Sequence, residues 1–315
     1  MIGEREIDGF AVLTLASGGE DGLEVAFAPG AGMVGCSLRH RGEELLGQRH
    51  GLAAYAGQGK TMGIPLLYPW ANRLGERRFA AGGREIDLTV AGLRLATDPL
   101  GLPIHGLLAG AAGWEVERHE SEGDGGVLVA RFDFEAHREL LAAFPFRHRL
   151  RYEARLSDGE LAIAVTVLAA GQAVPVSFGF HPYLQLPGVE RAAWEVEVPV
   201  AEQLLLDRSL LPIGAREPVA IEPGPLAERT FDDAFAAPPG GRPFVLAGGG
   251  RRIEVGLGSG YRFAQVYAPA DDAVIAFEPM TAPTNALVDG GPGLPLVPPG
   301  DSFTATFTIG VSATD

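Results

Sequence analysis

Short apolar segments separated by closely spaced turn residues run through this sequence, and this pattern restricts the fold more than any other feature. The 315 residues include 44 glycines and 24 prolines, and few apolar stretches follow the 3.6-residue period of a helix. Residues 303–311 alternate apolar and polar side chains with the period of two that marks a half-buried strand. The Asp158-Gly159 turn joins two more strand-like segments, 147–156 and 160–167, as in an antiparallel hairpin. The sequence therefore predicts an all-β protein.

The chain is long enough for a large buried core, and no internal repeat, low-complexity tract or linker divides it. We therefore expect one domain over residues 1–315. The formal net charge is −15 and no run of basic residues is present, which argues against nucleic acid or an anionic membrane surface as a partner. The single cysteine, Cys36, excludes an intrachain disulfide.

Residues 1–8 are charged and lack the apolar segment of a secretion signal. No uninterrupted apolar run reaches the roughly 18 residues that span a bilayer. We therefore expect a cytoplasmic protein that does not bind membranes.

Two strand-like segments each end in an ionisable residue followed by proline, Glu278-Pro279 and His181-Pro182. Since proline cannot donate to a β-ladder, both strands are predicted to end there. Glu278 and His181 would then lie where strand becomes loop, and the two ends could meet on one face of a sheet. Histidine is the side chain best suited to proton transfer near neutral pH. The plainer interpretation is a solvated glutamate and a histidine that caps a strand.

Two loop segments carry further candidates. Residues 63–73 contain Tyr68 and Trp70, then Asn72 and Arg73, which join flat apolar surface to hydrogen-bonding groups. An aromatic plug with an exposed arginine is the alternative. His105 lies between an apolar residue and a glycine, where a buried core histidine is also expected.

Two other polar groups stand in apolar surroundings. Asp232 and Asp233 lie between phenylalanines, where they either cap a short helix or hold a polar ligand. Gln265 lies in the middle of a predicted strand and needs a hydrogen-bond partner if its face is buried. The histidines at 40 and 148 are expected in solvated positions on hairpins and polar strand faces.

Taken together, these segments resemble the aldose 1-epimerase (galactose mutarotase) family over essentially the whole chain. The resemblance rests on the order and spacing of seven motifs: Pro69-Trp70-Ala71-Asn72-Arg73, Ile104-His105-Gly106, Gly179-Phe180-His181-Pro182-Tyr183, Leu206-Asp207 with Leu211-Pro212-Ile213-Gly214, Phe231-Asp232-Asp233-Ala234-Phe235, Gln265-Val266-Tyr267, and Phe277-Glu278-Pro279-Met280-Thr281. It implies a large antiparallel β-sandwich of the galactose mutarotase-like supersandwich type, with few short helices and a sugar cleft on one sheet.

The resemblance also implies roles for individual residues. Glu278 matches the general base of the family and His181 its general acid. The matches to sugar-binding positions are Arg73, His105, Asp232 and Gln265, and we add Asn72 because of its hydrogen-bonding amide. The role at 232–233 is assigned to Asp232. The residues after Glu278 differ from those of galactose mutarotases, so the preferred sugar stays open.

Mutarotation needs little machinery. The anomeric hydroxyl loses a proton, the ring oxygen gains one, and the open aldehyde recloses on its other face. One base and one acid suffice, each worth roughly 10²–10⁴ in rate. Ordinary pKa values of about 4.3 for glutamate and about 6.5 for histidine suit these roles near neutral pH. We therefore expect a small-molecule sugar as partner, no metal or other cofactor, and a monomer or homodimer.

Three alternatives stay open. A hexose-6-phosphate 1-epimerase would need extra cations at the rim of the cleft, for which Arg73, Arg77 and Arg78 are available. A carbohydrate-binding protein of the same fold would lack turnover. A cupin-like metal site would use His105, His181, Asp232 and Glu278, but their intervals are too long for a local ligand motif.

Overall fold

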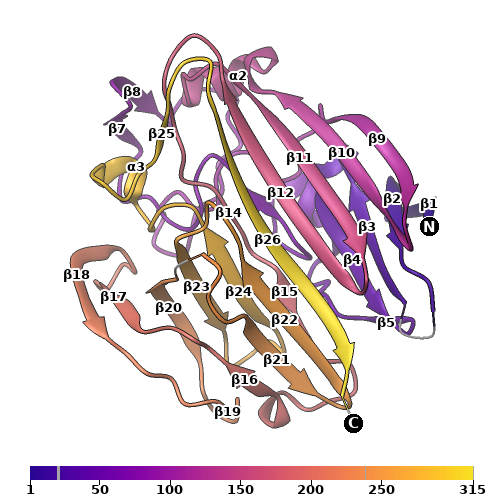
Figure 1. Cartoon of the computed structure of the whole chain (residues 1–315). Coiled ribbons are helices and arrows are strands. Elements are labelled where there is room, and N and C mark those ends of the chain that lie inside the picture. Colours follow the sequence, from indigo (N-terminus) through magenta and orange to yellow (C-terminus); the bar gives the residue numbers. More distant parts are fainter. Residues whose placement is uncertain (20–21, 238, 315) are drawn as a thin grey trace.

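Antiparallel sheets supply most of the regular secondary structure in the computed structural model of the chain, which describes residues 1–19, 22–237 and 239–314 (Figure 1). The largest sheet within these ranges has nine strands. In spatial order they are β19 (Gly224–Pro225), β16 (Glu195–Glu197), β21 (Phe244–Gly248), β22 (Arg251–Leu257), β26 (Ser302–Ala313), β12 (Glu160–Ala169), β11 (His148–Ser157), β10 (Gly125–Asp133) and β9 (Glu115–Glu122). Asp158 and Gly159 both have positive φ and form the tight turn between β11 and β12, which confirms that predicted hairpin.

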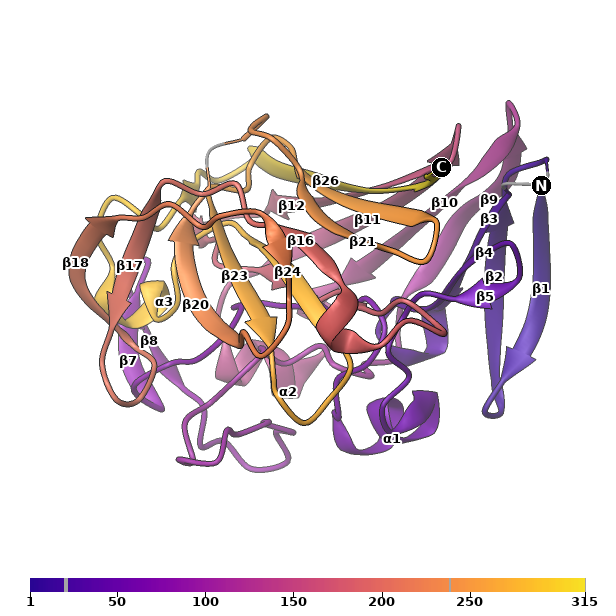
Figure 2. The same ribbon diagram turned by 90° about the horizontal axis from the view of Figure 1, so that it is seen from below.

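A second sheet of eight strands packs against the first. Its strands are β18 (Pro212–Pro218), β17 (Glu202–Leu206), β20 (Phe231–Ala236), β23 (Phe263–Ala268), β24 (Ile275–Met280), β14 (Gly179–Phe180) and β6 (Leu66–Leu67), with β15 (Tyr183–Leu184) paired to β24 beside this path. Figure 2 shows the two sheets as facing layers, with β26, β12 and β11 in one and β20, β23 and β24 in the other.

The N-terminal segment forms a third sheet, a simple meander. Its strands are β1 (Ile2–Ile7), β2 (Phe10–Ala16), β3 (Leu23–Ala28), β4 (Val34–His40) and β5 (Glu43–Glu44). Small pairs are β7 (Arg78–Ala81) with β8 (Arg84–Asp87), and β13 (Val174–Pro175) with β25 (Leu296–Val297). The helices of the described ranges are short: α1 (Gly51–Gln58), α2 (Arg138–Ala143), α3 (Ala286–Asp289), and the 3₁₀ turns η1 (Pro29–Ala31), η2 (Phe134–Ala136) and η3 (Arg191–Ala193). The expected all-β fold with few short helices is thus confirmed.

The core lies between the two large sheets. Phe307 of β26 packs its ring 4.8 Å from that of Phe180, and Phe244 of β21 lies 5.3 Å from Phe277 of β24. All four side chains are buried, and each contributes about 1.5–3 kcal/mol through burial. Since side chains alternate along a strand, Phe277 on the core face puts Glu278 on the opposite face of the sheet.

One sequence prediction about β24 is wrong. The strand does not end at Glu278 but continues through Pro279 to Met280, both of which pair with β23. The Pro279 carbonyl lies against Gly179, and Thr281 donates to Phe178, so this side of the strand faces β14. On this side β14 pairs with β24 through Gly179 and Met280, and β15 pairs with it through Ala276 and Ile275, so Pro279 belongs to neither set of pairs. A missing N–H is tolerated there because no ladder bond is required.

Two histidines predicted to be solvated are buried instead. His40 accepts a hydrogen bond from Arg251 at Nδ1, and His148 lies between the Tyr68 hydroxyl and the Phe146 carbonyl. Burial lowers the pKa of His148 to about 4. Asp232 and Asp233 lie within β20, so the helix-cap interpretation is wrong as well.

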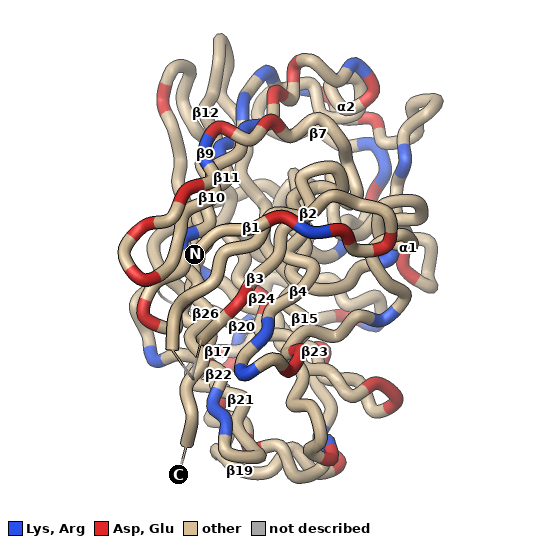
Figure 3. Tube along the Cα trace, turned by 90° about the vertical axis from the view of Figure 1, so that its right-hand side faces the viewer, with Lys and Arg blue, Asp and Glu red and all other residues tan. Residues whose placement is uncertain are grey.

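The described helices include none that is long and apolar enough to cross a membrane. Basic and acidic residues are interspersed along the trace on the side that Figure 3 shows. The cations visible there therefore do not form one continuous patch.

Candidate functional site

Three adjacent strands of the eight-stranded sheet place polar side chains on the face away from the core. Gln265 of β23 is in register with Glu278 of β24, and Asp232 of β20 is in register with Tyr267 of β23. Because the strand period is two, Asp232, Gln265 and Glu278 all project from this outer face. Asp233 projects from the opposite face, where its carboxylate accepts a hydrogen bond of 3.0 Å from Gln203. The strand alternation thus supports the choice of Asp232 over Asp233.

Gln265 has the partner that its burial requires. Its Nε2 donates to Oδ1 of Asp232 over 2.6 Å, while its Oε1 has no hydrogen-bond partner among the described residues. A buried acceptor without a donor is costly unless a ligand or water supplies one. The Gln265 carbonyl is therefore suited to a ligand hydroxyl.

Glu278 and His181 come together on this face. His181 lies between the two-residue strands β14 and β15, which flank the middle of β24. Its Nε2 is 3.2 Å from Oε1 of Glu278, and both side chains are at most 5% exposed. The second carboxylate oxygen of Glu278 and Nδ1 of His181 have no hydrogen-bond partner within the described ranges.

Burial changes the proton affinity of both groups in opposite directions. Desolvation raises the pKa of Glu278 well above its usual range, and the nearby Asp232 charge adds to this while Arg73 opposes it. Desolvation also lowers the pKa of His181 well below its usual value, assisted by His105 and Arg49. Both shifts favour the uncharged forms at rest, a protonated carboxyl beside a neutral imidazole, in contrast to the ordinary pKa values expected from the sequence.

Arg73 approaches the outer face from the loop after β6. Its Nε donates to Asp98 over 2.9 Å, its Nη1 donates to the Asn72 side chain over 3.0 Å, and Nη2 is 3.7 Å from Asp232. Asn72 has a φ of 57°, which asparagine tolerates better than most residues. Because the Asn72 side chain accepts this bond from Arg73, it orients the guanidinium.

His105 completes the set. Its ring meets that of His181 edge to face at 5.6 Å. Gly106 is required beside it, because a Cβ there would lie 2.2 Å from the Tyr68 carbonyl oxygen. Burial, with the Arg73 charge, lowers the pKa of His105 to about 3, so the ring is neutral at physiological pH.

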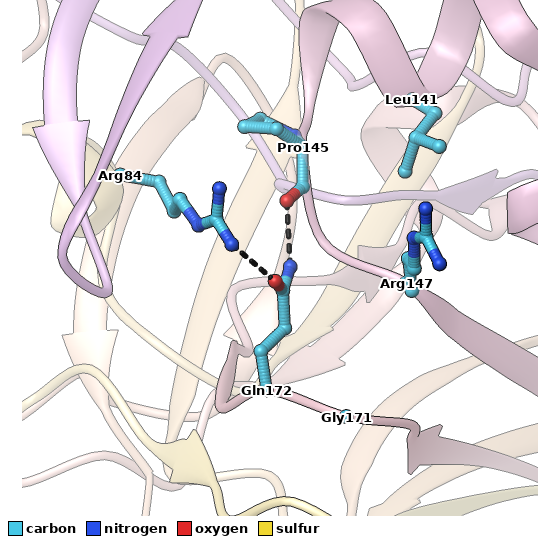
Figure 4. A pocket seen from close by; sticks show the side chains of 6 residues that line it. All are labelled: Arg84, Leu141, Pro145, Arg147, Gly171 and Gln172. Atoms are coloured by element: carbon cyan, nitrogen blue, oxygen red, sulfur yellow. Dashed lines mark hydrogen bonds between the residues drawn. The ribbon is translucent and has the colours of Figure 1, made fainter.

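A cleft of about 570 Å³ reaches this cluster at Arg73 and His105, whereas Glu278, His181, Asp232 and Gln265 are not among its lining residues. Arg73, Asp98 and His105 line one part of it, and Arg49, His50 and Lys60 line another. A separate hollow of about 420 Å³, shown in Figure 4, lies between Arg84 and Arg147 and contains none of the predicted site residues.

Sequence reasoning missed four residues of this region: Arg49, Asp98, Tyr183 and Tyr267. The Tyr183 ring stacks on His181 at 4.0 Å, and that of Tyr267 lies 5.5 Å away. Both tyrosines belong to motifs quoted above. Each lies two residues after a predicted site residue, so strand alternation could have placed it on the same face. Arg49 and Asp98 lie in loops whose contacts no local pattern predicts.

The alternative of a cupin-like metal site at His105, His181, Asp232 and Glu278 has no support in the structure. Among the described residues, no group of three or more histidine, cysteine, aspartate or glutamate side chains is arranged to hold a metal ion.

The fold and this outer-face cluster define a class, the all-β proteins of the galactose mutarotase-like fold. The family model for aldose 1-epimerase matches residues 15–310. The chain therefore belongs to the aldose 1-epimerase family, as the resemblance indicated. No curated protein matches the sequence significantly.

Solved structures share the fold at low sequence identity. A galactose mutarotase-like protein of Clostridium acetobutylicum is 18% identical, with 100% of this chain and 99% of that one covered and a TM-score of 0.84. A putative aldose 1-epimerase of Escherichia coli K12 is 19% identical, with 95% and 99% covered and a TM-score of 0.72. A galactose 1-epimerase of Lactobacillus acidophilus is 14% identical, with 100% and 99% covered and a TM-score of 0.75.

Proposed function

We propose that this protein is an aldose 1-epimerase that interconverts the α and β anomers of an aldohexose such as galactose or glucose. The observation that carries the proposal is the 3.2 Å contact between Glu278 and His181 on a face that also presents Arg73, Asp232 and Gln265. Family membership supports the reaction class.

The geometry suits the chemistry because both reacting oxygens are bonded to the anomeric carbon. The base that takes the proton of the anomeric hydroxyl and the acid that protonates the ring oxygen must therefore lie side by side. As the ring C–O bond breaks, the former hydroxyl oxygen becomes the aldehyde oxygen, and the electron pair of that bond remains on the ring oxygen, which takes the proton. Rotation about C1–C2 and the reverse steps give the other anomer.

Glu278 acts as the base and His181 as the acid in this proposal. The reacting form is the carboxylate beside the imidazolium, which differs from the neutral resting pair by one proton transfer between the two residues. During ring closure the roles are reversed: Glu278 returns its proton to the aldehyde oxygen and His181 takes the proton of the former ring oxygen, so the pair returns to its reacting form. Arg73, Asn72, His105, Asp232 and Gln265 hold the sugar hydroxyls.

Substitution of the base provides the test. Glu278→Gln keeps the shape and removes the proton acceptor, so kcat should fall roughly 10²–10⁴-fold with a much smaller change in sugar affinity. Anomer exchange of freshly dissolved α-glucose and α-galactose is followed by polarimetry, with the spontaneous rate subtracted, and sugar binding is measured by calorimetry.

His181→Asn should give a comparable loss, and the double variant should lose less than the product because the two residues act as one unit. More than about a tenth of wild-type turnover in Glu278→Gln would contradict the assignment and direct attention to Asp232. A wild-type protein that binds sugar without catalysing exchange would instead be a carbohydrate-binding protein.

A phosphorylated aldose is the second candidate substrate, and one observation favours it. Arg49 and Lys60 line the same cleft as Arg73, and Lys60 makes no ion pair within the described ranges. The predicted rim cations Arg77 and Arg78 line another hollow instead. We nevertheless expect unphosphorylated hexoses, because Arg49 and Arg73 are already paired with Asp272 and Asp98.

The comparison is kcat/KM for glucose and galactose against glucose 6-phosphate, in the wild type and in Lys60→Met. We expect no more than a few-fold difference between the substrates and little effect of the variant. A preference of a hundredfold or more for the phosphate, lost in Lys60→Met, would establish the phosphorylated sugar as substrate.

A further inference from the structure

His181 lacks the usual means of fixing the orientation of a proton-transferring histidine. In most such sites a carboxylate or carbonyl accepts a hydrogen bond from the ring nitrogen that does not react. Here Nε2 faces Glu278, and Nδ1 has no hydrogen-bond partner among the residues that the structure describes. The ring plane must be set by other contacts.

Aromatic neighbours supply these contacts. The Tyr183 ring stacks on His181 with centroids 4.0 Å apart and planes 18° apart. The rings of His105 and Tyr267 meet it edge to face at 5.6 Å and 5.5 Å. The buried Tyr183 ring makes the parallel contact, so, together with the Glu278 contact at Nε2, it restricts the plane of His181.

Tyr183 is in turn held at two points. Its hydroxyl lies 2.5 Å from the Thr61 hydroxyl, and the Arg49 guanidinium carbon lies 4.8 Å above its ring centroid. Asp272 anchors Arg49 through an ion pair of 2.9 Å. Burial raises the pKa of the Tyr267 hydroxyl and the Arg49 charge opposes that shift, so the same guanidinium also acts electrostatically on a second ring beside His181.

We propose that Arg49 is a positioning residue of the acid–base pair, which holds Tyr183 against His181 and so sets the orientation of the imidazole. Arg49 lines the cleft, but its guanidinium is occupied by Asp272 and Tyr183. The expected effect of Arg49 on turnover rests on the proposed function. Its expected effect on the orientation of His181 rests only on the contacts described above.

The kinetic test compares Arg49→Met with Arg84→Met, which removes a cation that binds Gln172 in the hollow of Figure 4. Because small misplacement of a reacting group costs up to about a hundredfold, Arg49→Met should lower kcat ten- to a hundredfold with KM changed less than about threefold. Arg84→Met should match the wild type. Arg49→Lys keeps the charge without the planar group and should restore kcat only in part.

A double-mutant cycle with Tyr183→Leu separates positioning from direct sugar contact. If Arg49 acts through Tyr183, Arg49→Met should have little further effect once the ring is gone. Additive losses, or a KM increase of tenfold or more with kcat unchanged, would overturn the proposal. Circular dichroism and thermal melts identify variants that fail to fold.

A measurement that does not depend on turnover tests the positioning role separately from the proposed mutarotase activity. In protein labelled at the histidine rings, the His181 resonance is assigned by its loss in His181→Asn. Arg49→Met should reduce the ring-current shift that Tyr183 imposes on this resonance, whereas Arg84→Met should not. An unchanged His181 resonance in Arg49→Met would refute the positioning role even if the protein proved not to be a mutarotase.

Discussion

Glu278 and His181 share one proton in an environment that disfavours charge on either residue. Desolvation is the main cause for both, raising the pKa of the carboxyl and lowering that of the imidazole. The pair therefore loses its first proton at a pH below the ordinary histidine value and its second at a pH above the ordinary glutamate value. The state with one proton, which the proposed mutarotation needs, spans the interval between these two losses.

This gives a prediction for the pH profile. Ordinary side chains would confine activity to a bell between about pH 4.3 and 6.5. Here the acidic limb should lie below that window and the basic limb above it, so kcat/KM should have a plateau extending beyond both ordinary values. The measurement is kcat/KM from pH 3.5 to 9.5, corrected for the spontaneous reaction and with folding monitored at each pH. A narrow bell within the ordinary window would contradict the shifted pKa values.

At this scale the sequence predicts which residues are candidates but not their ionisation. The repeated pattern of strand, ionisable residue and proline marks Glu278 and His181, and the structure brings them within 3.2 Å. Their pKa shifts depend on burial by loops far away in the chain, which no local pattern reveals. The predicted exposure of His40 and His148 is wrong in part for the same reason, since Arg251 contacts His40 and Tyr68 contacts His148 from distant parts of the chain.

The loop after β24 ties three elements of the site together. Thr281 donates to the Phe178 carbonyl from its backbone at 3.0 Å and from its hydroxyl at 2.9 Å, next to the segment that carries His181. Asn285 donates from its backbone to the Arg73 carbonyl over 3.1 Å, and its side-chain oxygen accepts from the Gly75 N–H over 2.7 Å. The chain that leaves Glu278 thus fixes the other two segments.

We predict that Asn285→Gly weakens sugar binding through Arg73. Glycine tolerates the φ of 68° at this position, so the variant removes the side chain without backbone strain. The part-buried Gly75 N–H loses its acceptor, at a cost of about 1–3 kcal/mol in unfolding free energy. KM should rise several-fold, more than kcat falls, as measured by steady-state mutarotation and urea unfolding.

Among the described residues the Asp289 side chain accepts from the Asn285 amide nitrogen alone, so Asp289→Ala leaves the Gly75 bond intact and is the matched control. It should change KM less than twofold. Equal effects of the two variants would show that the loop as a whole, rather than the bond to Gly75, positions Arg73.

The longer elements are predictable and the short ones are not. The hairpin through Asp158-Gly159 follows from its turn residues and its alternation. Two-residue strands such as β14 and β15 have no period to detect, and the extension of β24 through Pro279 depends on which edge of the strand its neighbours leave free.

Across the molecule, a buried arginine joins the N-terminal meander to the nine-stranded sheet. Arg251 of β22 donates to His40 over 3.1 Å and to Glu43 over 2.7 Å. It is only 7% exposed, so its charge depends on these partners. The connection spans more than 200 residues of sequence, which explains why composition and motifs do not predict how the sheets meet.

Arg251→Met should lower the unfolding free energy by about 1–3 kcal/mol, since it removes charge-assisted hydrogen bonds in a buried position. Arg252→Met is the neighbouring control: its partly exposed pairs with Glu197 and Glu254 should contribute less than about 1 kcal/mol. Urea unfolding measures both. A loss in Arg251→Met no larger than in Arg252→Met would show that the two sheets do not depend on this link.

The basic residue at the far wall of the cleft also has a chemical consequence. Of the 25 basic residues in the sequence, Lys60 is the only lysine and the others are arginines. Its side chain is exposed. The other primary amine of the chain, that of Met1, is hydrogen-bonded to the carbonyls of Ala16 and Gly125 beside the N-terminal meander. An amine-selective reagent therefore has one side-chain target, and that target borders the cleft. Loss of that single mass increment when a sugar is added would report occupancy of the cleft directly, without any optical signal from the sugar.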